Sequence, residues 1–127
     1  MKAPSLDDIE EMARRELARL PAEWQGFLQG VAILIADFPD REIEEEMELE
    51  SPFDLLGLYQ GVDLGHEHGG HVATDVNRIL LYRRPILDYW CETGEDLAHV
   101  LRHVLIHEIG HHFGLSDDDM ERIETEA

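Results

Sequence analysis

Apolar residues recur every three or four positions near the start of the chain, at Leu6, Ile9, Ala13, Leu17 and Leu20. This spacing predicts an amphipathic helix that ends near Pro21. Ser5 and Asp8 have the residue types and the three-residue separation of an N-terminal capping pair. Residues 22–30 are expected to add a second, short helical turn.

The next stretch changes from helical to strand-like patterning. Residues 31–36 (VAILIA) form a continuous apolar run rich in β-branched side chains, which predicts a buried strand. Residues 55–62 (LLGLYQGV) and 78–83 (RILLYR) predict two further strands, separated by a segment rich in Gly and His. The acidic run at 40–50 is expected to be a solvated helix or loop.

Helical patterning returns at Pro85, whose fixed φ suits the first turn of a short helix that ends at Thr93 and Gly94. Thr93, with Asp96 three residues later, is expected to cap a last helix that runs from about Gly94 to Phe113. The chain therefore reads as helices, then strands, then a long C-terminal helix.

One arc of this last helix is apolar, at about 100° per residue. It holds Leu97, Val100, Leu101, Val104 and Leu105. Glu108 and His111 continue the arc and His107 lies at its edge, so these groups are expected on the core-facing side. Ile106 and Ile109 point the other way, which predicts a helix covered on both sides. Burying a carboxylate and two imidazoles is costly unless a metal or a hydrogen-bond network satisfies them, which favours a metal site.

Length and composition restrict the class of protein. With 127 residues and 43% hydrophobic content, the chain predicts one core and a single domain over residues 1–127. The formal charge of −19 argues against a nucleic-acid partner, because phosphate binding depends on clustered Lys and Arg. Cys91, the lone cysteine, is interpreted as a core residue in a reducing compartment. Since neither a signal peptide nor a membrane span is expected, we predict a cytoplasmic protein.

Residues 107–117 read HEIGHHFGLSD and contain HExxH followed by xxGxxD. On a helix, His107 and His111 lie one turn apart on the same face, so both imidazoles can bind one zinc ion. Glu108 follows the first histidine and is the candidate general base, able to take a proton from the zinc-bound water and pass it to a leaving amine. The pattern predicts the chemistry of a zinc hydrolase.

The third protein ligand is expected just after this helix. Gly114 falls where the helix should stop, and its freedom to adopt the left-handed conformation can turn the chain back toward the metal. Asp117 follows three residues later and is the candidate third ligand, with Asp118 and Asp119 as alternatives. A fourth position would stay open for a water whose pKa zinc lowers to roughly 7.

Three more histidines share the predicted helix. His99 and His103 extend the four-residue series backward, but each step rotates about 40°, so both are expected to drift off the metal-facing edge. A supporting role beside the metal ligands stays open for His103. His112 lies about 100° from His111 and is expected to pack or to form hydrogen bonds rather than to bind the metal.

Further candidates lie upstream of the motif. The histidines of the sequence GHEHGGH are interpreted as a solvated loop, with metal binding as the alternative, at His66, His68 and His71. A tyrosine hydroxyl is a candidate to stabilise an oxyanion, and the sequence does not choose among Tyr59, Tyr82 and Tyr89.

The motif, together with LLGLYQGV and RILLYRRPIL upstream, resembles the small bacterial zincin-like metallopeptidases sometimes called minimal zincins, over roughly residues 6–120. The resemblance implies an α+β fold in which a small mixed sheet packs on an N-terminal helix and on the HExxH helix. It also implies zinc binding by His107, His111 and Asp117. The methionine turn of the larger metzincins has no clear counterpart, since Met120 lies very close to the motif.

The principal hypothesis is a zinc metallopeptidase, of the metalloendopeptidase type, that cleaves a peptide or protein substrate with Zn²⁺ as its cofactor. One alternative is a non-catalytic zinc-binding or interaction module, because so small a domain has little room for substrate subsites. Another is a metal-dependent endoribonuclease, which would need a basic RNA track that this composition hardly permits. Neither nucleic acid nor membrane is expected as a partner, and the sequence does not indicate an oligomeric state.

Overall fold

The computed structural model describes residues 2–61 and 77–125. The helices are α1 (Leu6–Ala18), α2 (Ala22–Leu28), α3 (Arg41–Glu46), the 3-10 turn η1 (Pro52–Asp54), α4 (Arg83–Thr93), α5 (Leu97–His112) and α6 (Asp117–Thr125). The strands β1 (Ala32–Ala36), β2 (Gly57–Gln60) and β3 (Arg78–Tyr82) form a sheet in the order β1-β3-β2. Since β1 runs parallel to β3 and β2 runs antiparallel to it, the predicted mixed sheet is confirmed.

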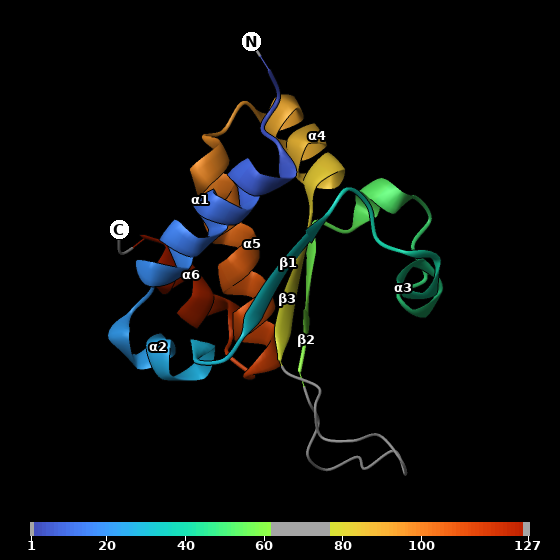
Figure 1. The fold of residues 1–127 in the computed structure, drawn as a ribbon. Coiled ribbons are helices and arrows are strands. Elements are labelled where there is room, and N and C mark those ends of the chain that lie inside the picture. The colour runs from blue at the N-terminus through green and yellow to red at the C-terminus, as the bar shows by residue number, and fades with distance from the viewer. Residues whose placement is uncertain (1, 62–76, 126–127) are drawn as a thin grey trace.

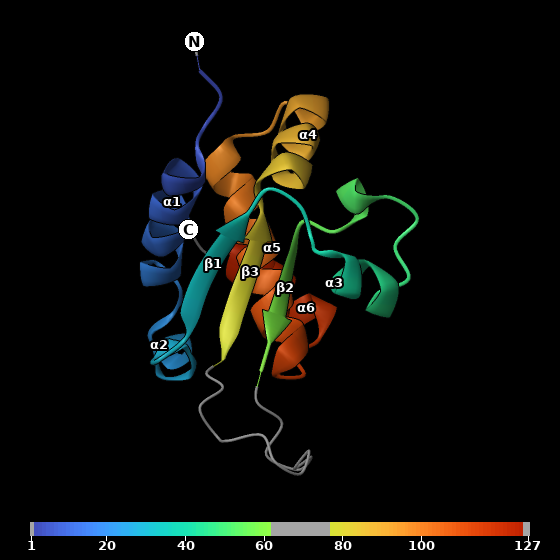
Figure 2. The same cartoon turned by 45° about the vertical axis from the view of Figure 1, so that its right-hand side comes forward.

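The main helical layer covers one face of the sheet. Figures 1 and 2 show α1 and α5 packed against the strands, with α6 on the far side of α5. Alternate strand residues point into this layer and meet the apolar arc of α5, at Ile33, Ile79, Leu81, Val100, Leu101 and Leu105. Ile106 and Ile109 are also fully buried, so the prediction that the last helix is covered on both sides is confirmed.

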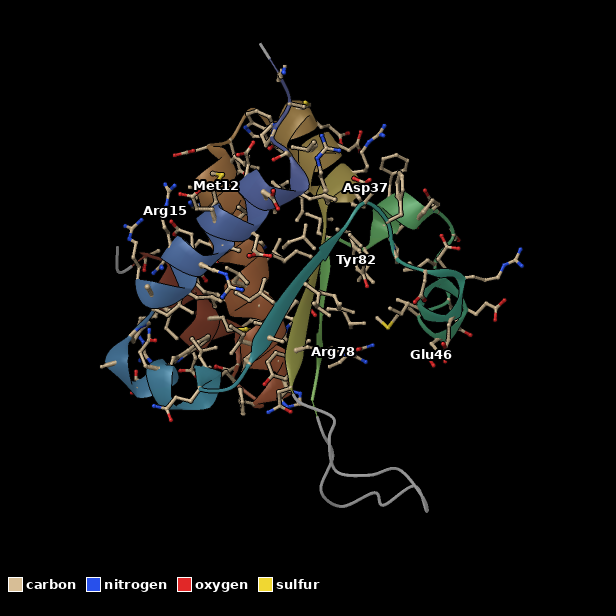
Figure 3. All side chains as sticks on the ribbon, viewed as in Figure 1. Met12, Arg15, Asp37, Glu46, Arg78 and Tyr82 are labelled. Atoms are coloured by element: carbon tan, nitrogen blue, oxygen red, sulfur yellow. The ribbon has the colours of Figure 1, made fainter. Side chains whose placement is uncertain are left out.

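The opposite face of the sheet is only partly covered. Leu34, on β1, is 44% exposed. Tyr82 is buried on the α3 side, where Figure 3 labels it together with Arg78 and Glu46. Arg78 and Glu46 line a pocket between α3 and the sheet, along with Asp40. The acidic run at 40–50 is thus the short α3, anchored by the buried Ile43, and the prediction of a solvated helix or loop is confirmed.

Helix starts follow the capping rules, with one correction. Ser5 and Asp8 form the predicted capping box at α1, each side chain accepting from the other's backbone N–H. The predicted cap of the last helix is wrong, because Thr93 is the final residue of α4. Gly94, in the left-handed region with φ 71°, ends α4, and Asp96 caps α5 by accepting from the backbone N–H of Ala98. The turn at Gly94 therefore separates α4 from α5, and α5 begins at Leu97 rather than near Gly94.

Helix α6 was not predicted and covers the far side of α5. Its buried residues are Met120 and Ile123, and the Arg102 guanidinium of α5 donates to the Ile123 carbonyl oxygen. Gly110 of α5 lets the two helices approach, since a Cβ there would overlap the Met120 side chain. The sequence did contain a signal for the start of α6, a serine three residues before Asp119. In the structure the Ser116 hydroxyl accepts from the backbone N–H of Asp119, as a helix cap does.

Other expectations have mixed outcomes. Cys91 is exposed, so its interpretation as a core residue is wrong. It lies near the end of α4, whose buried residues, Pro85 and Ile86, are near the start of the helix.

His66, His68 and His71 lie outside the described residues, as does the end of the predicted strand 55–62. In the described part of the chain, no helix is both long and apolar enough to cross a membrane.

Candidate metal centre

The two motif histidines lie on successive turns of α5, as the spacing predicts. Their ring centroids are 5.8 Å apart. His107 is half-buried, whereas the His111 side chain is 59% exposed. The expectation that His111 continues the core-facing side is therefore wrong, because the last turn of α5 extends past the residues that cover the helix upstream. The motif lies where the buried stripe opens to solvent.

Glu108 is held beside the edge of the sheet. Its carboxylate accepts a hydrogen bond from the backbone N–H of Tyr59. Burial raises the pKa of the Glu108 carboxyl, while the Tyr59 N–H and the nearby His111 act in the opposite direction. The result is a partly buried carboxyl with a raised pKa, one residue from the first motif histidine.

The hydrogen-bond pattern of β2 explains why Tyr59 is available to Glu108. The backbone N–H of Tyr82 donates to the Leu56 carbonyl, and Leu58 and Gln60 pair with Leu80 and Arg78 in the same register. In an antiparallel pair the intervening residues turn their backbone groups away from the partner strand. Tyr59 therefore directs its N–H to the open edge of β2, where Glu108 accepts from it.

Asp117 is the aspartate that reaches the motif histidines. Gly114, with φ 76°, makes the predicted left-handed turn after α5. Asp117 then begins α6, and its Oδ1 lies 3.9 Å from Nε2 of His111. Asp119 instead accepts from the Arg122 side chain. The assignment of Asp117 as third ligand stays a prediction, which its contact with His111 favours.

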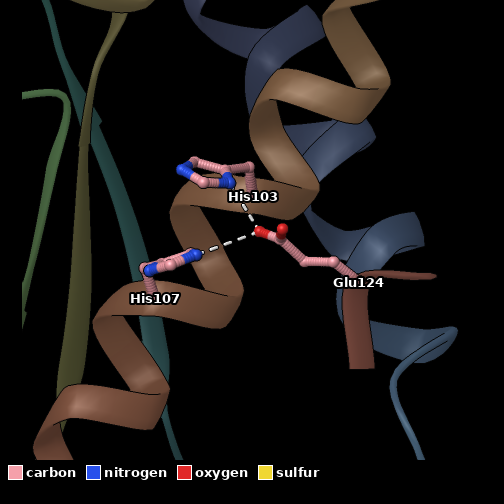
Figure 4. A group of neighbouring side chains, drawn as sticks. All are labelled: His103, His107 and Glu124. Atoms are coloured by element: carbon pink, nitrogen blue, oxygen red, sulfur yellow. Dashed lines mark ion pairs between the residues drawn. The ribbon is translucent and has the colours of Figure 1, made fainter. Parts of the chain in front are cut away.

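A second cluster joins α5 to α6. Figure 4 shows His103 and His107 on successive turns of α5, with the Glu124 carboxylate of α6 reaching between them. Oε1 of Glu124 lies 2.5 Å from Nδ1 of His103 and 3.2 Å from Nε2 of His107. His103 is exposed, as expected of a residue that drifts off the metal-facing edge, and its contact with Glu124 of another helix was not predicted. Glu124 was missed because nothing in its spacing from the motif identifies it.

Burial and two neighbouring histidines favour the neutral form of the His107 imidazole. Desolvation lowers the pKa of His107 most, and His103 and His111 lower it further, whereas Glu124 and Asp117 raise it. The neutral ring is the form that binds metals. His107 therefore has the protonation state that a ligand requires near neutral pH.

A pocket of about 310 Å³ adjoins these residues. Its walls are mostly apolar, with Leu55, Leu56, Val100 and Val104, and the polar groups at its edge include His103, His107 and Glu108. Apolar walls with a few polar groups are typical of ligand sites. The pocket adjoining the motif therefore has the lining of a ligand site.

The three tyrosines considered from the sequence have different surroundings. Tyr89 lines the pocket, and its side chain is partly exposed. Tyr59 stacks on His112 with the ring centroids 4.1 Å apart, and its hydroxyl is buried. Tyr82 lies on the α3 side of the sheet. Among them, Tyr89 is the one that lines the pocket, as Glu108 also does.

His112 has the packing role expected of it. Besides Tyr59, its ring contacts the backbone of Gly61, where any Cβ would overlap the imidazole. His99 is exposed, as expected. Neither histidine joins the two clusters around His107.

Comparison with known families gives one match. The model of the family described as zincin-like metallopeptidase matches residues 28–127, which include every strand, α5 and α6. The chain belongs to the zincin-like metallopeptidases. No curated protein matched the chain in a sequence search. Membership of this family confirms the resemblance stated from the motif and supports zinc as the metal in question.

The donor set of this zincin-like metallopeptidase fits zinc. Zinc in catalytic sites takes imidazole nitrogens and carboxylate oxygens, three from the protein, at about 2.0–2.2 Å. His107, His111 and Asp117 offer two nitrogens and one oxygen from the end of α5 and the start of α6. The His111 and Asp117 side chains are 59% and 91% exposed, so both are free to adjust to an ion.

Proposed function

We propose that this zincin-like metallopeptidase hydrolyses peptide bonds, with zinc held by His107, His111 and Asp117. The helical spacing of the two histidines and the 3.9 Å approach of Asp117 to His111 support this ligand set. Zinc bound there would polarise the scissile carbonyl and lower the pKa of the attacking water. The remaining steps are carried out by side chains and backbone groups of the protein itself.

The environment of the Glu108 carboxyl is the observation that best supports the proposal. A carboxyl with a raised pKa, fixed by the Tyr59 N–H at the edge of a pocket, suits a group that must both accept and release a proton. As general base, Glu108 takes the proton from the attacking water. It then delivers that proton to the leaving amine, which returns the carboxylate to its starting state.

The substrate we propose is an extended peptide beside β2. Gly57 has its backbone N–H and carbonyl on the open edge of this strand, and Tyr59 adds its carbonyl there, since its N–H is held by Glu108; these groups suit pairing with another extended chain. The pocket walls formed by Leu55, Leu56 and Val104 would take an apolar substrate side chain. Tyr89, at the same pocket, is the proposed donor to the oxyanion.

The Glu108→Gln substitution tests this function. The variant should keep one zinc per chain, because the ligands are unchanged, and should lose about 10²–10⁴-fold in turnover because the proton-transfer group is gone. Zinc is measured by elemental analysis and cleavage with a peptide library on the same zinc-loaded samples. Glu121→Gln, an exposed change on α6, is the matched control and should cleave like the wild type.

Two results would contradict the proposal. Turnover by Glu108→Gln equal to that of the wild type would remove Glu108 from the mechanism. A wild-type chain that holds zinc and cleaves no peptide of the library would instead support the non-catalytic zinc-binding module. His111→Ala, which breaks the proposed ligand set, should cleave no better than Glu108→Gln.

A further inference from the structure

We propose that His103, His107 and Glu124 form a second position for a divalent transition-metal ion, alternative to the HExxH position. The two positions share His107, so one ion occupies one or the other. The metal-binding part of this inference stands on the three residues themselves. Its consequence for cleavage rests on the proposed function.

The geometry is close to that of a three-ligand zinc site. One ring nitrogen of His103, one of His107 and a carboxylate oxygen of Glu124 lie within 4.8 Å of one another. Bond lengths of about 2.0–2.2 Å in a tetrahedral site place ligand atoms about 3.4 Å apart. Glu124 and His107, at 3.2 Å, are already near this separation. Glu124 and His103, at 2.5 Å, must separate by about 1 Å for one ion to fit between them.

Glu124 supplies a second, independent observation. Its Oε1 atom is buried and has no hydrogen-bond partner in the described part of the chain, although two imidazole nitrogens face it. This oxygen lies within ion-pair distance of both nitrogens, so a protonated imidazole and a bound cation are the two ways to satisfy it. A cation between the carboxylate and the two nitrogens would satisfy all three groups at once.

The cluster is also accessible to an ion. The His103 side chain is 47% exposed, and both histidines line the 310 Å³ pocket. The formal charge of −19 draws cations toward the surface of the molecule. Two imidazoles and one carboxylate are ligands that zinc and its neighbours Co²⁺ and Ni²⁺ accept.

Sharing of His107 makes the two positions exclusive. A neutral imidazole has one unprotonated nitrogen and so binds one ion at a time. An ion held by His103 and Glu124 therefore takes His107 away from His111 and Asp117. On the proposed mechanism, that ion is poorly placed to activate a water beside Glu108, and the chain holds metal without cleaving.

Titration of the full chain with Co²⁺ tests the second position, because the visible absorption of Co²⁺ reports its ligands without any need for activity. The wild type should bind one ion per chain. His111→Ala breaks only the HExxH set and should still bind one Co²⁺, with a changed spectrum. Adding Glu124→Gln to His111→Ala should weaken binding by more than about 100-fold, beyond the roughly 10–100-fold that loss of a supporting residue costs.

Matched double variants serve as controls. Glu121→Gln and His99→Ala change exposed residues on the same helices, so each combined with His111→Ala should bind Co²⁺ as His111→Ala does. His103→Ala with His111→Ala should lose the ion, which gives a second test if Glu124→Gln disturbs packing. Circular dichroism establishes that each variant is folded.

Three outcomes would overturn the inference. They are no Co²⁺ on a folded His111→Ala variant, equal affinity of the Glu124→Gln and Glu121→Gln doubles, and two ions on one wild-type chain. Failure of the peptidase proposal looks different, since it would leave Co²⁺ binding by His111→Ala intact while no sample cleaves. Cleavage by the wild type together with an empty His111→Ala variant would retain the function and reject the second position.

Discussion

The Tyr82 side chain is 2% exposed, and its hydroxyl has no hydrogen-bond partner within the described residues. Burial, together with the negative charge of Asp40, raises the pKa of Tyr82 to about 12. In the unfolded chain a tyrosine ionises near pH 10. The folded state therefore holds the Tyr82 proton over a range in which the unfolded state has released it.

Tyr82→Phe should remove one source of alkaline instability. A raised folded-state pKa contributes stability that is complete below the unfolded pKa of about 10 and is lost as the pH rises toward about 12. The variant should thus be as stable as the wild type or more so at neutral pH, and its stability should decline less between about pH 9 and pH 11.5. Urea unfolding across this range measures both effects.

Tyr89→Phe is the matched control for this comparison, because Tyr89 is partly exposed. It should follow the wild-type curve. A decline in Tyr82→Phe as steep as that of the wild type would contradict the assignment of the raised pKa to Tyr82.

Residues of the candidate site were predictable where their relation is local. His107, Glu108 and His111 are fixed by helical periodicity within one turn, and Asp117 follows through the Gly114 turn. His103 and Glu124 were not predictable as neighbours, because their approach depends on how α6 packs on α5. Spacing along one helix carries no information about a side chain from another.

At the scale of elements, Gly57 sets how closely β2 approaches α5. A Cβ at this position would lie 2.8 Å from the Val104 side chain and 3.1 Å from the Leu80 carbonyl oxygen. Neither neighbour retreats easily, since Val104 is branched and buried on a helix and the carbonyl belongs to the adjacent strand. The absence of a side chain is what lets the strand that positions Tyr59 lie against the HExxH helix.

Gly57→Ala should lower the free energy of unfolding by about 1–3 kcal/mol, the usual cost of overpacking. Gly26→Ala is a matched control within α2, where a Cβ would meet nothing within 4 Å. That change should instead stabilise the protein by about 0.5–1 kcal/mol. Chemical denaturation measures the free energy of unfolding of both variants. Equal changes of the same sign would contradict the close packing of β2 on α5.

Sequence patterns located most elements and misjudged some boundaries. The capping box of α1 and the apolar arc of α5 were read directly, because both signals are local. The start of α5 was placed too early, since Thr93 and Asp96 are both good caps and the left-handed Gly94 decides between them. Helix α6 is short and acidic, with only Met120 and Ile123 buried, and its weak period was overlooked.

At the scale of the whole molecule, the α+β architecture was predictable and the pairing of its strands was not. Three apolar runs predicted three strands, and family resemblance supplied the mixed sheet. That β3 lies between β1 and β2 follows from no pattern in the chain, because the order depends on how distant segments pack. The prediction of a single domain over residues 1–127 stays a prediction.

The formal charge of −19 on 127 residues should make stability depend on salt. Like charges repel in the compact state, and raising the ionic strength shortens the screening length from about 30 Å at 0.01 M to about 3 Å at 1 M. We expect the melting temperature at neutral pH to rise by about 3 °C or more over this range of NaCl. Differential scanning calorimetry measures the change.

The same titration near the sequence pI of about 4.5 is the control. There the net charge is small, so added NaCl should shift the melting temperature much less. A melting temperature at neutral pH that stays constant or falls with NaCl would show that repulsion between acidic side chains is a minor part of the stability.

The register of the sheet also sets an order of assembly. The β2–β3 pair joins Gln60 to Arg78, whereas the β1–β3 pair joins Ala32 to Arg78. Closing the longer loop costs about 0.8 kcal/mol more in chain entropy. We infer that the antiparallel pair forms first and that β1 docks later, with α1. The strand whose backbone contacts Glu108 thus belongs to the earlier unit, so this edge forms before the sheet is complete.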